Sequence, residues 1–406
     1  MKVNIKNKEL ILKYIPIVGV ISSISYYTLQ GSNLYFSLLK VLLIVTLLCG
    51  CISIYKDKKI SIKAIALLFF LMFLYIKLKD TRLIVAFFTI ACAKTIKFEN
   101  LIKIVFYTNL TCFLLSVISG GYHHINGFGL HFSILMMLMC YAMKDKKIKY
   151  FNIIMVLLYL IMGLITTSGS FIICGIIFCL LIMTQNKLLN KRIIYSKYIP
   201  YIFVICFIFN LIGAIYINVG RFQLINNITP GFLSFILEKI FGLVDILTTS
   251  RIQLANQSLF MFGFSLFGGN VDYTLLSNTH YFNLDSGYMW LLQGFGIIMT
   301  IIFLYYTVTM LKQAQRHKDN YIIYISIIIA LWAINEDILL NIGLNLSMIL
   351  YSKYLNEKLE ERSNGNTKNN SLLLVWGEST TRVGNKMHKF MEKIFSRVRN
   401  KRVERK

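Results

Sequence analysis

The sequence predicts an all-α fold, a polytopic bundle of transmembrane helices with one long loop outside the cytoplasm. Hydrophobic residues make up 56% of the 406 residues and charged residues only 15%, whereas about a quarter of the residues in a soluble domain are charged. The mean hydropathy is +0.64. The charges come in clusters between long apolar runs, which is the pattern of helices that cross a bilayer and of loops that meet water.

A helix needs about 20 apolar residues to cross the hydrocarbon core, and on that scale the chain contains about twelve candidate spans. The fourth and the last of them are short or interrupted by polar residues. The spans lie near residues 10–28, 35–55, 62–78, 82–97, 101–119, 128–144, 150–167, 169–184, 198–218, 287–311, 320–335 and 338–354.

The basic loops predict the orientation of these spans. They fall on alternate sides of successive spans, and cytoplasmic loops are enriched in Lys and Arg, so we place them and both termini in the cytoplasm. One segment disagrees, because 77–82 falls on the outer face and carries Lys77, Lys79 and Arg82. Either the third and fourth spans are drawn wrongly, or these cations bind something anionic outside. The basic loops lie at 56–59, 94–103, 144–149, 186–192 and 312–318.

The formal net charge of +25 would suggest a nucleic-acid partner in a soluble protein. In a membrane protein the cytoplasmic enrichment of cations accounts for it, and no basic face with interleaved aromatic residues stands outside the C-terminal tail. We therefore expect no nucleic-acid partner. The eight cysteines lie mostly inside apolar runs, without a CxxC pair, and are predicted to be small core residues.

The long outer loop is the segment 219–286. It alternates apolar patches with polar residues and contains a Gly268-Gly269 break, which predicts short amphipathic or re-entrant helices at the bilayer surface. We divide the chain into a transmembrane domain at 1–355, which includes this loop, and a basic cytoplasmic tail at 356–406. The tail either forms an amphipathic helix on the anionic inner leaflet or is a solvated segment that only enforces the topology.

Ionisable residues beside apolar helices are costly, and each is a candidate functional group. Arg251 has apolar residues on both sides; its guanidinium either donates two hydrogen bonds to a phosphate or reaches from the bilayer interface to water. Asp285 stands just before the tenth span, where capping that helix is the common role of an aspartate. Beside a substrate hydroxyl it would instead act as a general base.

Further polar residues stand at the outer ends of two spans. Glu336 and Asp337 end the eleventh span, and adjacent residues point about 100° apart on a helix, so at most one should face the bundle interior. His123, His124 and His131 gather near the sixth span, but no carboxylate or cysteine completes a metal site. No nucleotide-binding motif and no GxSxG is present, so any substrate must be reachable from the membrane.

The order of several motifs resembles that of the Wzy-type polysaccharide repeat-unit polymerases, in the form found in capsule and exopolysaccharide loci of low-GC Gram-positive bacteria. His123 departs from the family's pattern, which often has an arginine there, and Ser168-Gly169-Ser170 lacks an arginine that often follows the small residues. The similar stretches are HHINGFG at 123–129, TTSGS at 166–170, LTTSRIQLANQSLFMFGFSLFGG at 247–269, HYFNLDSGYMWLLQGFGII at 280–298 and WAINEDILLNIGLN at 332–345.

The resemblance implies a glycosyltransferase of the bacterial cell membrane that needs no metal and no cofactor. Such an enzyme moves a growing saccharide from polyprenyl pyrophosphate onto a sugar hydroxyl of the next lipid-linked unit, at the outer face. Implied partners are the lipid-linked oligosaccharide, membrane lipids, and a chain-length regulator and a flippase of the same pathway. The candidate catalytic residues are Arg251, Asp285 and Glu336, and the candidate binding residues are His123, His124, Tyr288, Arg221, Arg82 and His280.

Two other functions fit the same architecture. A flippase or transporter of lipid-linked units would favour internal repeats and charges near the membrane midplane; the sequence shows no clear repeat, and its charges stand at the outer ends of spans. A ligase that attaches finished polymer to another acceptor differs from the polymerase only in that acceptor.

Overall fold

The computed structural model describes residues 5–29, 36–57, 62–122, 125–144, 150–166, 168–185, 187–216, 231–247, 251–269, 271 and 284–354. Residues 1–355 form one compact unit. Within the described ranges the chain forms helices and no strand, which confirms the all-α class. The predicted tail at 356–406 lies outside the described residues.

Each predicted span up to 320–335 coincides with a helix. These helices are α1 (Ile5–Thr28), α2 (Phe36–Asp57), α3 (Ile62–Leu78), α4 (Arg82–Ala93), α5 (Phe98–Ile118), α6 (Ile125–Ala142), α7 (Phe151–Thr166), α8 (Gly169–Met183), α10 (Ile202–Tyr216), α14 (Gly287–Arg316) and α15 (Asn320–Trp332). A short helix α9 (Leu188–Ile194) and the 3-10 turn η2 (Ile199–Tyr201) precede α10.

The predicted span at 338–354 is wrong as a continuous helix. Turns run from residue 333 to 345, and only the five-residue helix α16 (Leu346–Leu350) follows. Asparagine side chains explain the difference: the Asn341 carbonyl accepts the backbone N–H of Gly343 at 3.1 Å, and the Asn345 amide donates to the carbonyl of Leu339 at 2.7 Å. Such bonds compete with the helical ladder.

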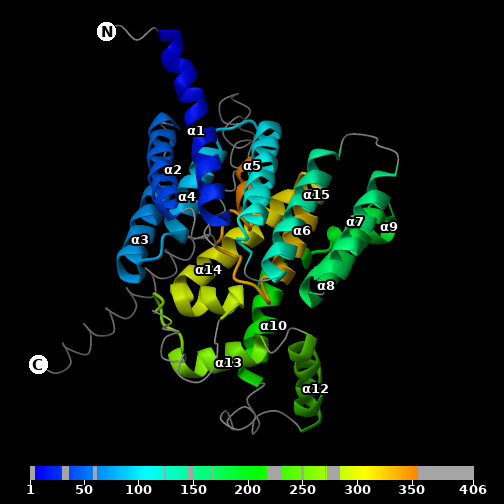
Figure 1. Cartoon of the computed structure of the whole chain (residues 1–406). Coiled ribbons are helices and arrows are strands. Elements are labelled where there is room, and N and C mark those ends of the chain that lie inside the picture. The colour runs from blue at the N-terminus through cyan, green and yellow to red at the C-terminus, as the bar shows by residue number, and fades with distance from the viewer. Residues whose placement is uncertain are drawn as a thin grey trace, which may run out of the picture. The chain divides into compact units, whose positions relative to one another are not determined.

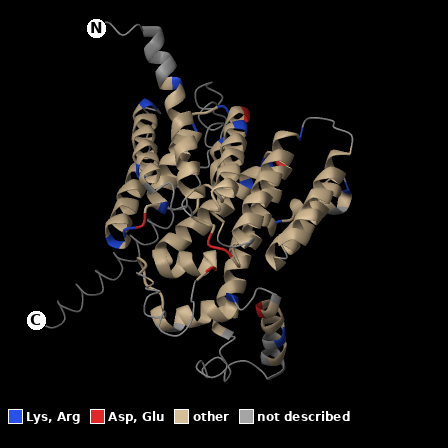
Figure 2. Ribbon diagram, in the orientation of Figure 1, with Lys and Arg blue, Asp and Glu red and all other residues tan. Residues whose placement is uncertain are grey.

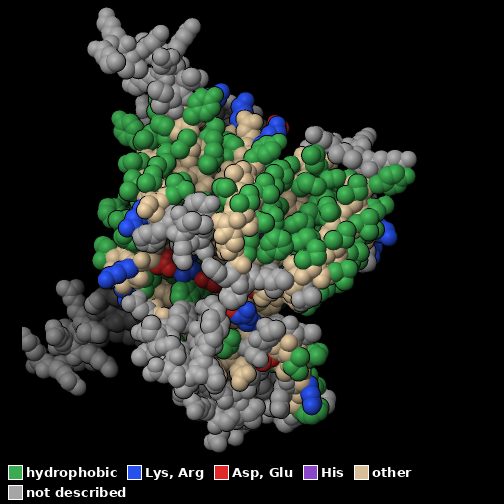
Figure 3. All heavy atoms as spheres, in the orientation of Figure 1, with side chains coloured by type: hydrophobic (Ala, Val, Ile, Leu, Met, Phe, Trp, Pro, Cys, Tyr) green, Lys and Arg blue, Asp and Glu red, His purple; other side chains and the backbone are tan. Residues whose placement is uncertain are grey.

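Three described segments are long and apolar enough to cross a membrane, namely Ser37–Lys56, Phe98–Ile118 and Gly287–Arg316. The other apolar helices are shorter; α4 has 12 residues, or about 18 Å at the rise of an α-helix. The larger number of spans therefore stays a prediction. Hydrophobic side chains cover most of the upper part of the face shown in Figure 3, and acidic and basic side chains are visible below them. An apolar surface of this extent suits contact with lipid.

The predicted loop at 219–286 contains two described helices, α12 (Gly231–Leu247) and α13 (Arg251–Phe262). Figure 1 shows both on the side of α10 and α14 that faces away from α1. The segment therefore contains helices within the described residues. That they are amphipathic helices at the bilayer surface, and that the segment lies outside the membrane, stay predictions.

Two glycine motifs meet where α14 is broken. Gly296 lies inside α14 with φ +88° and ψ 170°, which interrupts the helix, and Gly268 has φ +71°. A Cβ on Gly268 would lie 2.1 Å from the carbonyl oxygen of Gly294, and a Cβ on Gly296 would lie 2.2 Å from the nitrogen of Gly268. Only glycine permits both the left-handed backbone and this approach.

The segment 263–269 supplies the hydrogen bonds that the break in α14 removes. The N–H of Gly269 donates to the carbonyl of Gln293 at 3.0 Å, and the N–H groups of Ile297 and Ile298 donate to the carbonyls of Ser265 and Leu266 at 3.0 and 3.2 Å. We call this contact between 263–269 and the break at Gly296 the glycine joint.

Lysine and phenylalanine side chains attach the glycine joint to α3. Lys77 Nζ donates to the carbonyl of Gly268 at 2.8 Å. The ring of Phe267 lies against the rings of Phe70 and Phe73, with centroid distances of 6.5 and 5.5 Å. The joint therefore fixes α3, α14 and the end of α13 to one another next to the polar residues described below.

Candidate functional site

Arg251 begins α13 and forms an ion pair with Asp285, which stands just before α14. The side chains are 17% and 14% exposed. The carboxylate of Asp245, near the end of α12, accepts the N–H groups of Ile252 and Gln253 at 2.9 and 3.0 Å. These N–H groups have no partner within a helix, so Asp245 fixes the beginning of α13 and with it the position of Arg251.

The prediction that Asp285 caps α14 is wrong, because the helix begins one residue later than that role requires. Ser286 is the N-cap, and its hydroxyl accepts the N–H of Met289 at 3.4 Å and donates to Asn210 Oδ1 at 3.1 Å. The carboxylate of Asp285 is therefore available to pair with Arg251.

The turn after α15 lies against the beginning of α14. The N–H of Gly287 donates to the carbonyl of Ala333 at 3.0 Å, and a Cβ on Gly287 would lie 2.8 Å from the carbonyl oxygen of Glu336. Asn335 Nδ2 donates to the hydroxyl of Ser170 at 2.8 Å. The turn is thus fixed between α8 and α14, and it brings Glu336 next to the Arg251 pair.

Glu336 has a carboxyl group with a strongly raised pKa. Its Oε1 is buried without a hydrogen-bond partner among the described residues. Burial raises the pKa of Glu336 to about 7, against the opposing effects of the positive charge of Arg251 and of a hydrogen bond from the side chain of Asn126; the charge of Asp337 adds to the rise. A carboxyl group with such a pKa exchanges a proton near neutral pH.

Asp337 belongs to a second set of charges. Arg82 Nη1 donates to Asp337 Oδ2 at 2.5 Å, and the same guanidinium bonds both oxygens of Asp80 at 2.8 to 3.2 Å. Its centre also lies 5.0 Å from the ring of Trp290 and 5.4 Å from that of Phe295. Burial raises the pKa of Asp337, and Arg82 opposes this rise.

Two sequence expectations change here. Since α15 ends at Trp332, Glu336 and Asp337 stand on a turn, and the helical angle between neighbours does not apply; each contacts a different set of charges. At the segment 77–82, α3 ends at Leu78 and α4 begins at Arg82 as drawn, although α4 ends at Ala93 and not at 97. The cations of Lys77 and Arg82 have partners within the protein.

Among the remaining predicted binding residues, only Tyr288 lies in the described part of the chain, and it belongs to neither set. Tyr288 is fully buried, and its hydroxyl donates to the carbonyl of Ala330 at 2.9 Å. His123, His124, Arg221 and His280 lie outside the described residues. His131 is buried against the hydroxyl of Tyr122, 2.5 Å from its Nδ1.

Sequence reasoning missed Asp80, Asn126 and Trp290. Asp80 had a signal, since it stands in the one outer segment that carried unexpected cations. Asn126 and Trp290 had none, because an asparagine and a tryptophan near a helix end are ordinary interfacial residues.

The site consists of two adjacent sets of charges: Arg251, Asp285 and Glu336 in one, and Arg82, Asp80 and Asp337 in the other. Figure 2 shows acidic stretches of the chain in the middle of the view, between α3 and α10. Its guanidinium groups suit phosphate oxygens, and its Glu336 carboxyl suits proton transfer. In the described part of the chain, no three or more His, Cys, Asp or Glu side chains lie together as ligands for a metal ion.

Comparisons with protein families, with curated proteins and with solved structures find no match to this chain.

Proposed function

We propose that this chain is a multi-pass membrane glycosyltransferase that polymerises polyprenyl-pyrophosphate-linked oligosaccharide units on the outer face of a bacterial cell membrane. Both termini lie in the cytoplasm in this proposal. The observation that carries it is the grouping of Arg251, Asp285 and Glu336 from three distant stretches of the chain. The Arg251 guanidinium is suited to bind a pyrophosphate, and the Glu336 carboxylate is suited to accept a proton from a hydroxyl.

Arg251 would bind the pyrophosphate and stabilise its charge as it leaves. The bond between C1 of the donor sugar and the phosphate oxygen breaks, and the electron pair stays on that oxygen, where charge develops in the transition state. A fixed guanidinium stabilises such charge more than it stabilises the bound substrate. The pair with Asp285 holds Arg251 in place before the substrate binds.

Glu336 would act as the general base. As the acceptor hydroxyl oxygen bonds to C1 of the donor sugar, its proton passes to the Glu336 carboxylate. The pKa of about 7 favours this role, because a base is most effective when its pKa is near the working pH. Asp285 is the weaker candidate, since Arg251 neutralises it.

The saccharide ladder of a deletion strain tests the proposal. We expect the strain to make single repeat units and no longer chains, and the wild-type gene to restore the ladder. Arg251→Lys and Arg251→Ala should insert into the membrane at normal levels and fail to restore it. The control is Arg316→Lys at the exposed far end of α14, which should restore it fully. A normal ladder from either Arg251 variant would refute the role of this residue.

A transporter of the same lipid-linked units is the competing function. The described charges of the site stand at helix ends and in turns, whereas a transport site is expected near the midplane. The break in α14 at Gly296 is a feature that transporters share. An assay in inverted vesicles separates the two functions: movement of lipid-linked units without chain growth would refute the polymerase. A ligase would instead form one bond to a different acceptor and leave the ladder intact.

A further inference from the structure

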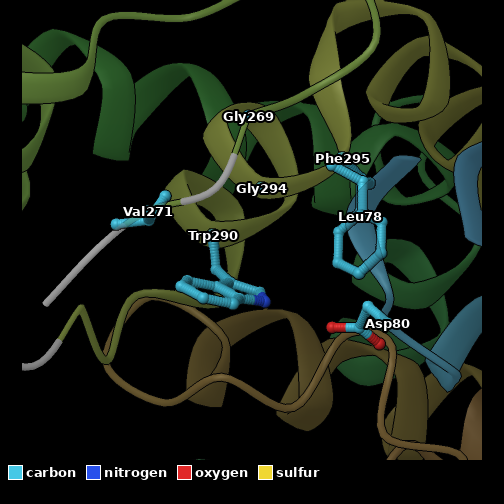
Figure 4. Close-up of a pocket in the computed structure, with 7 residues that line it drawn as sticks. All are labelled: Leu78, Asp80, Gly269, Val271, Trp290, Gly294 and Phe295. Atoms are coloured by element: carbon cyan, nitrogen blue, oxygen red, sulfur yellow. The ribbon is translucent and has the colours of Figure 1, made fainter. Parts of the chain in front are cut away.

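A pocket of about 250 Å³ opens next to Arg82, and none of its lining residues has a role in the bond-forming step proposed above. Its walls come from the end of α3, the segment after α13 and the first half of α14. The lining residues, shown in Figure 4, are Leu78, Asp80, Gly269, Val271, Trp290, Gly294 and Phe295. Because α3, α14 and the glycine joint are bonded to one another, these walls are held in fixed relative positions.

The pocket combines an aromatic surface with a carboxylate. Figure 4 shows the indole of Trp290 between Val271 and Asp80, with its nitrogen-bearing edge toward Asp80. The side chain of Trp290 is only partly buried, so it is not an ordinary core residue. A sugar ring offers C–H groups on its face, which pack on an aromatic ring, and hydroxyls at its edge, which donate to a carboxylate. Small-ligand sites combine apolar walls and a few fixed polar groups in this way.

The charge and the size of the pocket restrict the kinds of ligand that it can bind. The two cations bonded at its walls, Lys77 and Arg82, balance the carboxylates of Asp80 and Asp337, and the nearby Lys79 is exposed to solvent. A neutral ligand therefore avoids an uncompensated charge at the walls. A quaternary ammonium also binds aromatic rings. Here the guanidinium of Arg82 already lies over the ring of Trp290, and its positive charge would repel the ammonium group. The volume is below the roughly 300–1,000 Å³ of sites for drug-sized ligands, which suits one ring.

We propose that this pocket binds a single neutral sugar ring, with Trp290 under its face and Asp80 accepting from its hydroxyls. Trp290 stands in the first turn of α14, which begins two residues after Asp285, and Asp80 is connected through Arg82 to Asp337, the neighbour of Glu336 in the chain. A ring held here belongs to the saccharide that reacts at Glu336, and this assignment rests on the proposed function. The proposal that the pocket binds a sugar does not depend on that function.

Two variants test the pocket without removing Trp290. A Cβ on Gly294 would contact the Trp290 ring at 3.6 Å, an ordinary distance, and alanine is the better helix former. Gly294→Ala should therefore keep the fold while narrowing the pocket. Asp80→Asn removes the charged acceptor. The matched control is Glu99→Gln, which removes an exposed carboxylate at the beginning of α5.

The measurement is ligand-observed saturation-transfer NMR with the full chain in lipid nanodiscs. The probes are N-acetylglucosamine and galactose as neutral sugars, glucosamine and glucuronate as charged sugars, and choline. We expect saturable binding of a neutral sugar, weaker binding of the charged probes, and a Kd raised about tenfold by Gly294→Ala and by Asp80→Asn. Glu99→Gln should bind as the wild type does.

The proposal is overturned if neither neutral sugar binds saturably, if choline or a charged sugar binds more tightly, or if both pocket variants keep the wild-type Kd. Arg251→Ala separates this proposal from the polymerase. It should lose the saccharide ladder and keep the sugar affinity of the wild type. Sugar binding together with a normal ladder from Arg251→Ala would refute the role of Arg251 and leave the pocket standing.

Discussion

Replacing Gly268 with alanine tests the glycine joint. The left-handed backbone at this position, with φ +71°, costs an L-residue roughly 1–2 kcal/mol. The new Cβ would lie 2.1 Å from the carbonyl oxygen of Gly294, so the segment 263–269 must move away from α14. Three backbone hydrogen bonds across the joint are then lost, at about 1 kcal/mol each.

The total is about 4–5 kcal/mol, or roughly a thousandfold in the ratio of closed to open joint. Hydrogen exchange followed by mass spectrometry measures this ratio at the amides of Ile297 and Ile298, which donate across the joint. In Gly268→Ala, these amides should exchange about a thousandfold faster than in the wild type if exchange requires opening of the joint.

Gly269→Ala is the matched control. No atom lies within 4 Å of a Cβ at Gly269, and its backbone is not left-handed. Its N–H bond to Gln293 is also open to alanine. This variant should keep wild-type exchange at Ile297 and Ile298. Equal protection of these amides in the two variants would refute the reasoning, because the close approach at Gly268 would then carry no cost.

Further predictions concern the ionisation of Glu336 and the ion pair between Lys353 and Asp319. Because a base must be ionised, polymer formation in membranes should rise with pH through about 7, the pKa of Glu336, and fall about tenfold per unit below it; a rate that is flat between pH 5 and 8 would contradict this role. Burial raises that pKa above its ordinary 4.5, so the fold is most stable while Glu336 is protonated and loses about 3 kcal/mol as pH rises from about 4.5 to about 7. Glu336→Gln should remove this loss in thermal unfolding above pH 7. Lys353 Nζ lies 2.8 Å from Asp319 Oδ2, whose side chain is 4% exposed; Lys353→Met should destabilise the protein by about 3 kcal/mol, because it leaves a buried carboxylate without its cation, while Lys187→Met on the exposed surface should not.

The helices were largely predictable from the sequence, because a long run of apolar residues predicts a helix in a chain with the composition of a membrane protein. The prediction failed at 338–354, where hydropathy is high but Asn341 and Asn345 bond the backbone locally. Hydropathy averaged over a window does not detect this competition. The break at Gly296 was also invisible to it, since the residues on both sides are apolar.

Most of the charged residues of the site were predicted from the sequence, but Asp80 was missed and the pairings were not predicted. Arg251, Asp285 and Glu336 were expected because charges are costly beside apolar helices. The role of Asp285 depended on a helix boundary one residue away, and sequence patterns do not place boundaries that finely. Asp80 and Asp337 share Arg82 only because the turns after α3 and α15 meet, which is a tertiary contact without a local signal.

The positions of these charges follow from where the helices end. Each turn in an apolar bundle leaves backbone groups that need partners. Here side chains bond several of these backbone groups. Ser286 accepts the N–H of Met289, Asn210 Nδ2 donates to the carbonyl of Ile334 at 3.1 Å, and Lys77 donates to the carbonyl of Gly268 at the glycine joint. The arginines and three of the carboxylates are likewise paired.

Glu336 differs from these paired carboxylates, since its Oε1 is buried without a hydrogen-bond partner among the described residues. Glutamine there would lack the ionisation cost and fill the same space. A buried carboxyl group with a pKa of about 7 is an energetic cost that packing does not require, and costs of this kind concentrate at functional sites. Glu336 is therefore the strongest candidate for a catalytic residue in this structure. The proposed role of Arg251 depends on its position next to Glu336.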